Sequence, residues 1–316
     1  MTELRRIPFK AVVVAVFLAC PSLARASTRC DLPGDNLRVC SSCFDRVSDD
    51  ALDVLKPVVG AEEHRRWHHN WHLLRYRIAG DVKALSESPK GSTERRLAQD
   101  ELDGWRDMGL LVGDAQEFSK LHSVSGEISG EDFLYMHREM LKMEQRMLAA
   151  QGKPCVAGWK ELPASISDHS WPAPLKAPDH PTGDSPSAFW QKKLDLLRRN
   201  DAMLRDPKYL RLVSLNHMAQ DVELYVHNVL HLLYSDAASH CHGDWDASST
   251  CDDLMPPWSS PLNPHFWKIH GHIDDFIGLW LEAHDYKEIA SDCAGRPACY
   301  QWRGTWVGKM DMSAHR

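Results

Sequence analysis

The sequence predicts a mainly α-helical fold. Apolar residues recur at helical spacing over long stretches, these stretches have clear start and stop signals, and alternating strand patterns are scarce. The chain has 316 residues, of which 43% are hydrophobic and 26% are charged, as in globular proteins with enough chain to bury a core. Its formal net charge of -7 leaves no basic excess, so we expect neither nucleic acid nor an anionic membrane surface as a partner.

The first 26 residues have the features of a secretory signal peptide. A basic start with Arg5 and Arg6 precedes an apolar run at 11–19, and a small-x-small cleavage site ends at Ala26. We expect cleavage after Ala26 and export to the periplasm or the extracellular space. No later stretch reaches 18 apolar residues, so no membrane span is expected. The remaining residues, 27–316, are predicted to form a single domain.

Eight cysteines follow the predicted signal peptide, and an even number in an exported chain predicts disulfide bonds. They are Cys30, Cys40, Cys43, Cys155, Cys241, Cys251, Cys293 and Cys299. Their spacing does not define how they pair. Cys40 and Cys43 are also compatible with half of a zinc site or with a redox motif, but no second Cys or His pair lies nearby at zinc-ligand spacing.

Five stretches carry a helical pattern of apolar residues and define the expected helices. They are residues 49–78, 130–150, 187 to beyond 197, 218–234 and 264–284. Gly152 follows the second stretch as a stop signal, and Pro264 occupies a favourable first-turn position in the last. Residues 80–129 combine short helical pieces with Gly and Ser breaks.

Prolines concentrate in the middle of the chain and divide the predicted domain into two halves. Seven of them fall between Pro154 and Pro186, which is typical of a long loop or a linker. The predicted parts are a first half at about 60–150, a Pro-rich connection at 152–186, a second half at about 187–284 and a Cys-containing tail at 285–316.

The first half contains two histidines one helical turn apart. His68 and His72 are four residues apart, so on a helix their rings lie on one face and can hold one metal ion. His64 extends this face by another turn and is a reserve ligand. His137 lies on a mostly apolar stripe of a later helix, where a histidine is either a hydrogen-bonded core residue or a further ligand.

The second half repeats this arrangement. His227 and His231 are again four residues apart, and they lie among apolar residues. Their rings therefore need partners, because an unpaired buried polar group costs about 1–3 kcal/mol. His270 lies on the next helix, and Asp274, four residues later, is placed to accept a proton from the second nitrogen of its ring.

The ligand types decide which metals are expected. Imidazole suits copper, zinc, iron and nickel. A mononuclear zinc protease has a Glu directly after the first His of the pair, whereas this chain has His69 and Asn228 at those positions. A helical di-iron site needs Glu-x-x-His, but Glu223 precedes His227 by four residues rather than three. The two His pairs, each followed by another His-bearing helix, therefore favour a site with two metal ions.

At these residues the chain resembles the type-3 copper proteins, and within them the arthropod hemocyanin and phenoloxidase branch. The resemblance covers about 64–143 and 217–284. It rests on His68-His69-Asn70-Trp71-His72-Leu73, Asp132-Phe133-Leu134-Tyr135-Met136-His137, His227-Asn228-Val229-Leu230-His231, and Asn263-Pro264-His265-Phe266-Trp267-Lys268-Ile269-His270 followed by Asp274. In the last motif Asn263 replaces the Asp of the family.

The resemblance implies an antiparallel four-helix core that holds two copper ions and binds dioxygen between them. The implied ligands are His68, His72 and His137 for the first copper, and His227, His231 and His270 for the second. The compact size favours an enzyme that hydroxylates monophenols or oxidises catechols or o-aminophenols to quinones. A dioxygen- or copper-binding protein without turnover is the alternative, and a helical protein with structural or zinc-binding histidines is a third possibility.

The resemblance also assigns a role to Asn228, which follows the first histidine of the second pair. In tyrosinases an Asn at this position helps to hold a basic water. Asp221 or Glu223 would be its companion carboxylate, although Glu223 is more readily interpreted as a charge on the helix surface.

The spacing between His72 and His137, 65 positions, is much larger than in the arthropod branch. The insert is expected either to form a lid or to supply His122 as the ligand in place of His137. Expected partners are a small phenolic or catecholic substrate and a copper-delivery protein, with His240 and His242 as residues that could receive the ion.

Overall fold

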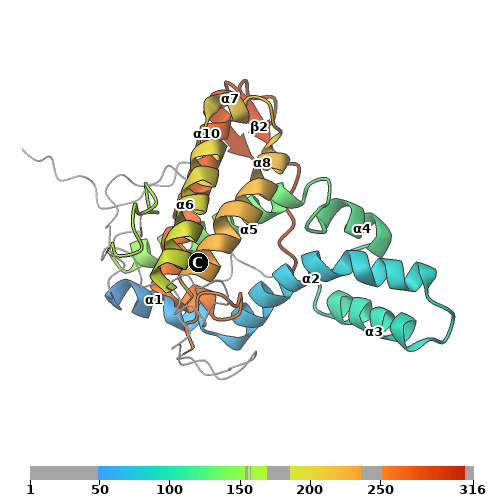
Figure 1. The fold of residues 1–316 in the computed structure, drawn as a ribbon. Helices are drawn as coiled ribbons and strands as arrows, with labels where there is room; N and C mark the ends of the chain where they lie inside the picture. The colour runs from blue at the N-terminus through green and yellow to red at the C-terminus, as the bar shows by residue number, and fades with distance from the viewer. Residues whose placement is uncertain (1–48, 154–155, 157, 169–185, 236–250, 310–316) are drawn as a thin grey trace, which may run out of the picture.

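The computed structural model describes residues 49–153, 156, 158–168, 186–235 and 251–309, and this part of the chain is mainly helical (Figure 1). The prediction of a mainly α fold is therefore confirmed. The predicted signal peptide, the cysteines that precede α1, most of the Pro-rich connection and the segment containing His240 and His242 lie outside the described residues. Among the described helices, none combines the length with the apolar composition that crossing a bilayer requires.

Helices dominate the order of elements along the chain. The elements are α1 (Asp49–Val59), α2 (Glu62–Glu87), α3 (Thr93–Asp107), α4 (Ala115–His122), α5 (Ser129–Ala150), α6 (Pro186–Leu204), α7 (Pro207–Leu210), α8 (Leu215–Val222), the π-helix η1 (Glu223–His227), α9 (Asn228–Leu233), the 3-10 helix η2 (Ser260–Leu262), α10 (Pro264–Ala283), β1 (Glu288–Ala290) and β2 (Cys299–Gln301). α5 packs against both α8 and α10, while α3 and α4 pack along α2. The expected helices at 130–150 and 264–284 are thus confirmed as α5 and α10.

The first expected helical stretch, 49–78, forms two helices instead of one. The chain breaks between α1 and α2 at Gly60, where a Cβ atom would lie 2.6 Å from the carbonyl oxygen of Lys56, so only glycine fits this turn. α2 continues well beyond the expected end, where α3 covers its apolar side. An ion pair between Arg77 Nε and a Glu101 carboxylate oxygen, 2.9 Å apart, adds a polar contact between the two helices.

The expected helix at 218–234 begins earlier and contains a π-helical turn. Its first residues are capped by Ser214, whose hydroxyl accepts a hydrogen bond from the backbone N–H of His217 at 3.2 Å. α8, η1 and α9 follow one another without a break. π turns inside α-helices are frequent at functional sites, and η1 ends on His227, the first histidine of the second pair.

Two buried arginine–carboxylate pairs connect the helices that carry the histidines. Arg75 on α2 donates to both carboxylate oxygens of Glu223 on η1, at 2.7 and 2.8 Å, and to the carbonyl oxygen of Ser129 on α5, at 2.9 Å. Arg138 on α5 donates to both carboxylate oxygens of Asp274 on α10, at 2.7 and 2.9 Å. Bidentate pairs fix orientation as well as distance, so they hold α2, η1, α5 and α10 in one relative arrangement.

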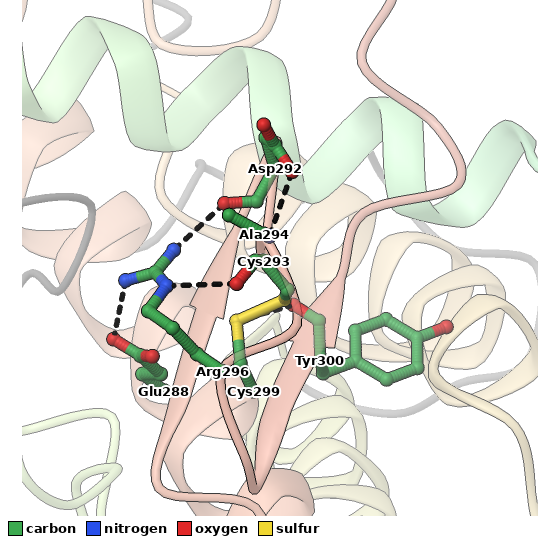
Figure 2. The surroundings of a disulfide bond; sticks show 7 residues. All are labelled: Glu288, Asp292, Cys293, Ala294, Arg296, Cys299 and Tyr300. Carbon is green, nitrogen blue, oxygen red and sulfur yellow. Dashed lines mark hydrogen bonds and ion pairs between the residues drawn. A yellow bond between two sulfur atoms is a disulfide. The ribbon is translucent and has the colours of Figure 1, made fainter.

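A disulfide and a short pair of strands organise the chain after α10. β1 and β2 pair in parallel, and the disulfide between Cys293 and Cys299 closes the loop that joins them (Figure 2). Arg296 donates to the carbonyl oxygen of Cys293 at 3.0 Å and to a carboxylate oxygen of Glu288 at 3.0 Å (Figure 2). Cys251 is disulfide-bonded as well. The Cys293–Cys299 disulfide and the contacts of Arg296 thus fix the loop that leads into β2.

The described residues after β2, 302–309, form a C-terminal segment that runs back to α2. Trp306 stacks on Trp71 of α2, with ring centroids 5.1 Å apart, and the Trp67 indole donates to the carbonyl oxygen of Val307 at 2.8 Å. The Asp132 carboxylate at the start of α5 accepts a hydrogen bond from the backbone N–H of Trp306 at 2.9 Å. The C-terminal segment therefore connects α2 to the start of α5.

Replacing Arg75 by Met is expected to lower the free energy of unfolding by about 3–5 kcal/mol, because Glu223 would be left charged and buried without its partner. Arg66 pairs with Glu62 on the exposed side of the same helix, so Arg66→Met is expected to cost less than about 1 kcal/mol. Urea denaturation of the metal-free protein measures both losses. Combining Arg75→Met with Glu223→Leu should recover part of the lost free energy of unfolding. Equal losses for Arg75→Met and Arg66→Met would contradict the role of the buried pair.

Candidate metal centre

The six predicted histidine ligands are all buried and converge between α2, α5, the η1–α9 segment and α10. They include two groups whose ligand nitrogens lie within 4.8 Å of one another: His68, His72 and His137 in the first, and His137, His227 and His270 in the second. His137 is thus common to both groups. His231 lies beside the second group, with its ring centroid 4.4 Å from that of His227 and 5.3 Å from that of His270.

Two of these histidines are oriented by their own helices. His137 donates from Nδ1 to the carbonyl oxygen of Phe133 at 2.9 Å, and His270 donates from Nδ1 to that of Phe266 at 2.7 Å. A carbonyl oxygen can only accept, so Nδ1 carries the proton in both rings. The Nε2 atoms therefore present their lone pairs to the centre of the site.

The predicted support of His270 by Asp274 is wrong. The Asp274 carboxylate instead accepts two hydrogen bonds from Arg138 on α5. Helical side chains tilt towards the N-terminus of their helix, so the His270 ring reaches back to the carbonyl of Phe266 and not forward to the next turn.

A loop that precedes η2 supplies carbonyl groups to one histidine of each pair. His68 donates from Nδ1 to the carbonyl oxygen of Pro257 at 2.5 Å, and His231 donates from Nδ1 to that of Leu254 at 2.5 Å. The same loop therefore sets the tautomer of a ring on α2 and of a ring on α9. No spacing in the sequence relates this loop to the histidines, so the sequence alone did not identify it.

His227 is oriented by a neighbouring side chain. Its Nδ1 donates to Oδ1 of Asn228 at 2.9 Å, and Nδ2 of Asn228 donates to the hydroxyl oxygen of Tyr76 on α2 at 3.2 Å. The amide thus fixes the tautomer of His227 and connects η1 to α2. Asn228, which the resemblance assigned to holding a basic water, contacts a candidate metal ligand directly.

The nitrogen atoms at the centre of the site fit a bound cation. With Nδ1 protonated in both rings, Nε2 of His227 and Nε2 of His270 face each other as lone pairs, 3.1 Å apart. The Nε2 atoms of His68, His137 and His231 are buried without a hydrogen-bond partner in the described structure. Each such group costs about 1–3 kcal/mol when it is left unsatisfied. Metal coordination would satisfy all of these nitrogens at once.

Burial keeps the clustered imidazoles neutral. It lowers the pKa of His68 from 6.5 to about 3 and that of His231 to about 4. Burial, followed by repulsion from neighbouring rings, also lowers the pKa well below 6.5 for His72, His137, His227 and His270. The neutral ring is the form that binds metal, so at neutral pH no proton has to be displaced from these ligands.

A cavity of about 290 Å³ opens onto the histidines. Its walls come from α2, the η1–α9 segment, the loop before η2, the start of η2 and the first turn of α10. They consist of His68, His69, His72, Leu73, Tyr76, His227, Asn228, His231, Met255, Pro257, Ser260 and Phe266. Since an apolar cavity of about 150 Å³ can hold benzene, this one has room for a substituted aromatic ring.

His122 is not part of the site, contrary to its candidacy as a substitute ligand. Its Nδ1 donates to the Asp132 carboxylate at 2.6 Å. The residues between His72 and His137 form the end of α2, α3, α4 and the start of α5, and none of those described after Tyr76 lines the cavity. The insert therefore supports α2 from the side and does not form a lid.

Neither carboxylate considered as a companion of Asn228 lines the cavity. Glu223, interpreted from the sequence as a surface charge, is only 1% exposed and binds Arg75. Asp221 accepts a hydrogen bond from the hydroxyl of Tyr209. Asn228 therefore has no acidic partner at the cavity among the described residues.

The sequence did not identify much of the cavity wall. His69 was not among the predicted site residues, but it lines the cavity together with Leu73 and Tyr76. These three residues recur at helical spacing on α2, and this spacing is a signal by which they could have been found. Met255 and Pro257 come from a loop whose position only the tertiary structure defines.

A scan against protein-family models finds no match for this chain, and a search of curated proteins finds no significantly similar sequence. The arrangement of the side chains is therefore the basis for assigning a function. Two adjoining groups of buried histidines define a site where a metal ion could bind to each group.

The metal-free protein is expected to lose stability as the pH falls below about 6.5. Histidines of the unfolded chain take up protons near this pH, whereas folded His231 does so only near pH 4, so protons favour the unfolded state between these values. Each buried ring of this kind contributes about 1.4 kcal/mol per pH unit.

Urea denaturation at a series of pH values measures this slope. His231→Gln should make the slope shallower, because it removes one buried ring that resists protonation. His217→Gln, the same replacement at an exposed position, is the control for the loss of a histidine that is not buried. A slope that is insensitive to His231→Gln would contradict the neutral, buried state of this ring.

His137 is expected to be the position most sensitive to replacement, because it belongs to both histidine groups. After loading with copper and desalting, His137→Gln should retain less metal than His231→Gln, as measured by elemental analysis. His122→Gln should retain as much as the unchanged protein. Equal loss of metal in His137→Gln and His231→Gln would contradict the inference that His137 contributes to both histidine groups.

Proposed function

We propose that this chain is a dinuclear copper protein in which His68, His72, His137, His227, His231 and His270 hold two copper ions within an antiparallel four-helix core. One observation carries the proposal: Nδ1 of five of these rings is committed to an oxygen acceptor, which leaves Nε2 facing the interior of the cluster. The histidine groups include no carboxylate or thiolate from the described residues, and an all-imidazole set suits copper. The positions of the histidines also agree with the resemblance of the sequence to type-3 copper proteins.

Within this class, we infer an oxidoreductase that uses dioxygen to hydroxylate monophenols or to oxidise catechols or o-aminophenols to quinones. The bound copper would supply the transfer of electrons from the substrate to dioxygen. In the catechol reaction, two catechols lose four electrons and four protons, and one dioxygen takes them up to form two waters. The signal-like N-terminal sequence supports export of the enzyme.

The apolar rings around the histidines support this chemistry because they exclude water. Phe266 packs on His270, with ring centroids 3.9 Å apart, and Trp71 packs on His72 at 5.0 Å. Protons that reached the ligands would compete with the metal, so a dry, neutral cluster favours metal retention. The cavity remains as the route by which a substrate reaches the cluster.

Asn228 is the described residue best placed to hold a water or a substrate oxygen beside the metal ligands. Its Oδ1 accepts from His227, and one Nδ2 hydrogen is donated to Tyr76. The amide has a second Nδ2 hydrogen, which can be donated to an oxygen atom inside the cavity. Asn228 therefore orients the ring of His227 and can hold the oxygen atom of a water or a substrate in the cavity.

The cavity favours turnover over transport of dioxygen. A carrier needs access for a diatomic molecule only, whereas this cavity has room for an aromatic ring next to both histidine groups. The size and position of the cavity thus support an enzyme that oxidises small phenolic substrates.

An oxygen electrode tests the proposal directly. The copper-loaded protein is expected to consume dioxygen with at least one member of a panel of monophenols, catechols and o-aminophenols. His270→Gln should lose at least about 100-fold in rate, because removal of a ligand empties or displaces one copper. His217→Gln on the surface is the matched control and should retain full activity.

An absorption spectrum, combined with the oxygen-uptake measurement, distinguishes an oxidase from a dioxygen-binding protein without turnover. Air admitted to the reduced, copper-loaded protein should produce an intense near-ultraviolet band that His270→Gln abolishes. This band without oxygen uptake on the whole panel would favour a dioxygen-binding protein. Absence of bound copper after loading would contradict the dinuclear copper proposal.

A further inference from the structure

We propose that the cavity selects uncharged single-ring phenols, catechols or o-aminophenols, and that Tyr76 positions them by donating its hydroxyl proton to an oxygen of the substrate. This inference rests on the proposed function, since it names the substrate class of the same site. It is carried by the chemical character of the cavity wall and by the hydrogen-bond arrangement at Tyr76.

No Asp, Glu, Lys or Arg belongs to the described wall of the cavity. Its polar groups are imidazole rings, the amide of Asn228 and the hydroxyls of Tyr76 and Ser260, and the rest is apolar. The nearest arginine along α2, Arg75, is fully buried and is occupied by Glu223. A substrate that carries a carboxylate or an ammonium group would therefore find no oppositely charged side chain among the described residues of this wall.

The volume of the cavity allows a ring with a substituent to enter together. At about 290 Å³ it is roughly twice that of a cavity that holds benzene. A charged group that enters with the ring loses bulk water and gains no oppositely charged side chain of the described wall. This exchange lowers affinity, because an unpaired charge is costly to desolvate.

Tyr76 has the geometry of a donor to a bound substrate. Its hydroxyl oxygen already accepts a hydrogen bond from Nδ2 of Asn228 at 3.2 Å. No acceptor for its own proton lies within hydrogen-bond distance in the described structure, and the side chain is 47% exposed at the cavity. The proton is therefore available to an oxygen atom that enters the cavity.

The surroundings of Tyr76 keep that proton on the hydroxyl. Burial and the nearby Glu223 carboxylate raise the pKa of Tyr76 above its ordinary value. The hydroxyl thus serves as a hydrogen-bond donor and not as a base. Through Asn228 it is connected to His227, so a substrate held by Tyr76 lies next to the second histidine group.

Steady-state kinetics of the copper-loaded protein test the selection by charge. 4-Methylcatechol, 3,4-dihydroxybenzoate and dopamine share one catechol ring and differ in the charge of the substituent. We expect kcat/KM for 4-methylcatechol to exceed that for both charged catechols by at least about ten-fold. Equal values for the three substrates would overturn the selection while leaving the proposed oxidase function intact.

The role of Tyr76 is tested with Tyr76→Phe, which removes only the hydroxyl. KM for 4-methylcatechol is expected to rise about five-fold, the effect of one neutral hydrogen bond, with kcat changed less than about two-fold. Tyr225→Phe is the matched control, because Tyr225 is similarly exposed but does not line the cavity. An unchanged KM for Tyr76→Phe would overturn the assignment.

Binding to the metal-free protein separates this inference from the proposed function. Calorimetry should show that 4-methylcatechol binds more tightly than 3,4-dihydroxybenzoate, and that Tyr76→Phe weakens the binding of 4-methylcatechol whereas Tyr225→Phe does not. Such a result together with no turnover would support the selection of uncharged rings by the cavity and contradict the oxidase proposal. Equal binding of the neutral and charged catechols would overturn the inference whatever the activity.

Discussion

The buried pair formed by Arg75 and Glu223 connects the two halves of the histidine site. Arg75 lies three residues after His72 on α2, and Glu223 lies four residues before His227 on η1, so their contact relates one ligand group to the other. Buried ion pairs contribute little net stability, because desolvation of both charges offsets their attraction. Their bidentate geometry instead defines one relative position of the two helices. We infer that positioning the histidines is the main consequence of this pair.

The protonation state of the cluster follows from backbone geometry. His137 and His270 are held by carbonyls of their own helices, while His68 and His231 are held by a single loop. In every case the oxygen acceptor assigns the proton to Nδ1, so the Nε2 lone pairs meet inside a dry interior. Lone pairs that meet in this way are unfavourable unless they are satisfied. A metal ion that bound them would satisfy them, so the proposed metal binding and the stability of the fold would be coupled.

α2 presents cavity-lining residues on one side and contacts supporting elements on another. One side carries His69, Leu73 and Tyr76 into the cavity. Another side carries Trp67 and Trp71, which the C-terminal segment covers through Trp306 and Val307. A helix held in this way presents its histidines on a rigid element, as a preorganised metal site requires. The long insert after His72 extends this support, because α3 and α4 pack along α2.

Much of the candidate metal site was predictable from local periodicity. The i, i+4 spacing of the two histidine pairs and the helices around His137 and His270 depend on residues near in sequence, and helical geometry then places the rings on one face. The choice of His137 over His122 was not decided by spacing, because both lie within reach in the sequence. The hydrogen bond of His122 with Asp132 removes it from the site, and this contact exists only in the folded chain.

The sequence by itself determined the helical class of the fold and the candidate set of six histidines, because these depend on helical period and side-chain chemistry. Asn228 entered through the resemblance to type-3 copper proteins. The tertiary structure alone decided the partners of the charged groups and the wall of the cavity. Asp274 and Glu223 each bind an arginine on another helix, and the loop with Met255 and Pro257 reaches the histidines only after folding. Such contacts join residues far apart in the chain, where local spacing carries no information about which groups will meet.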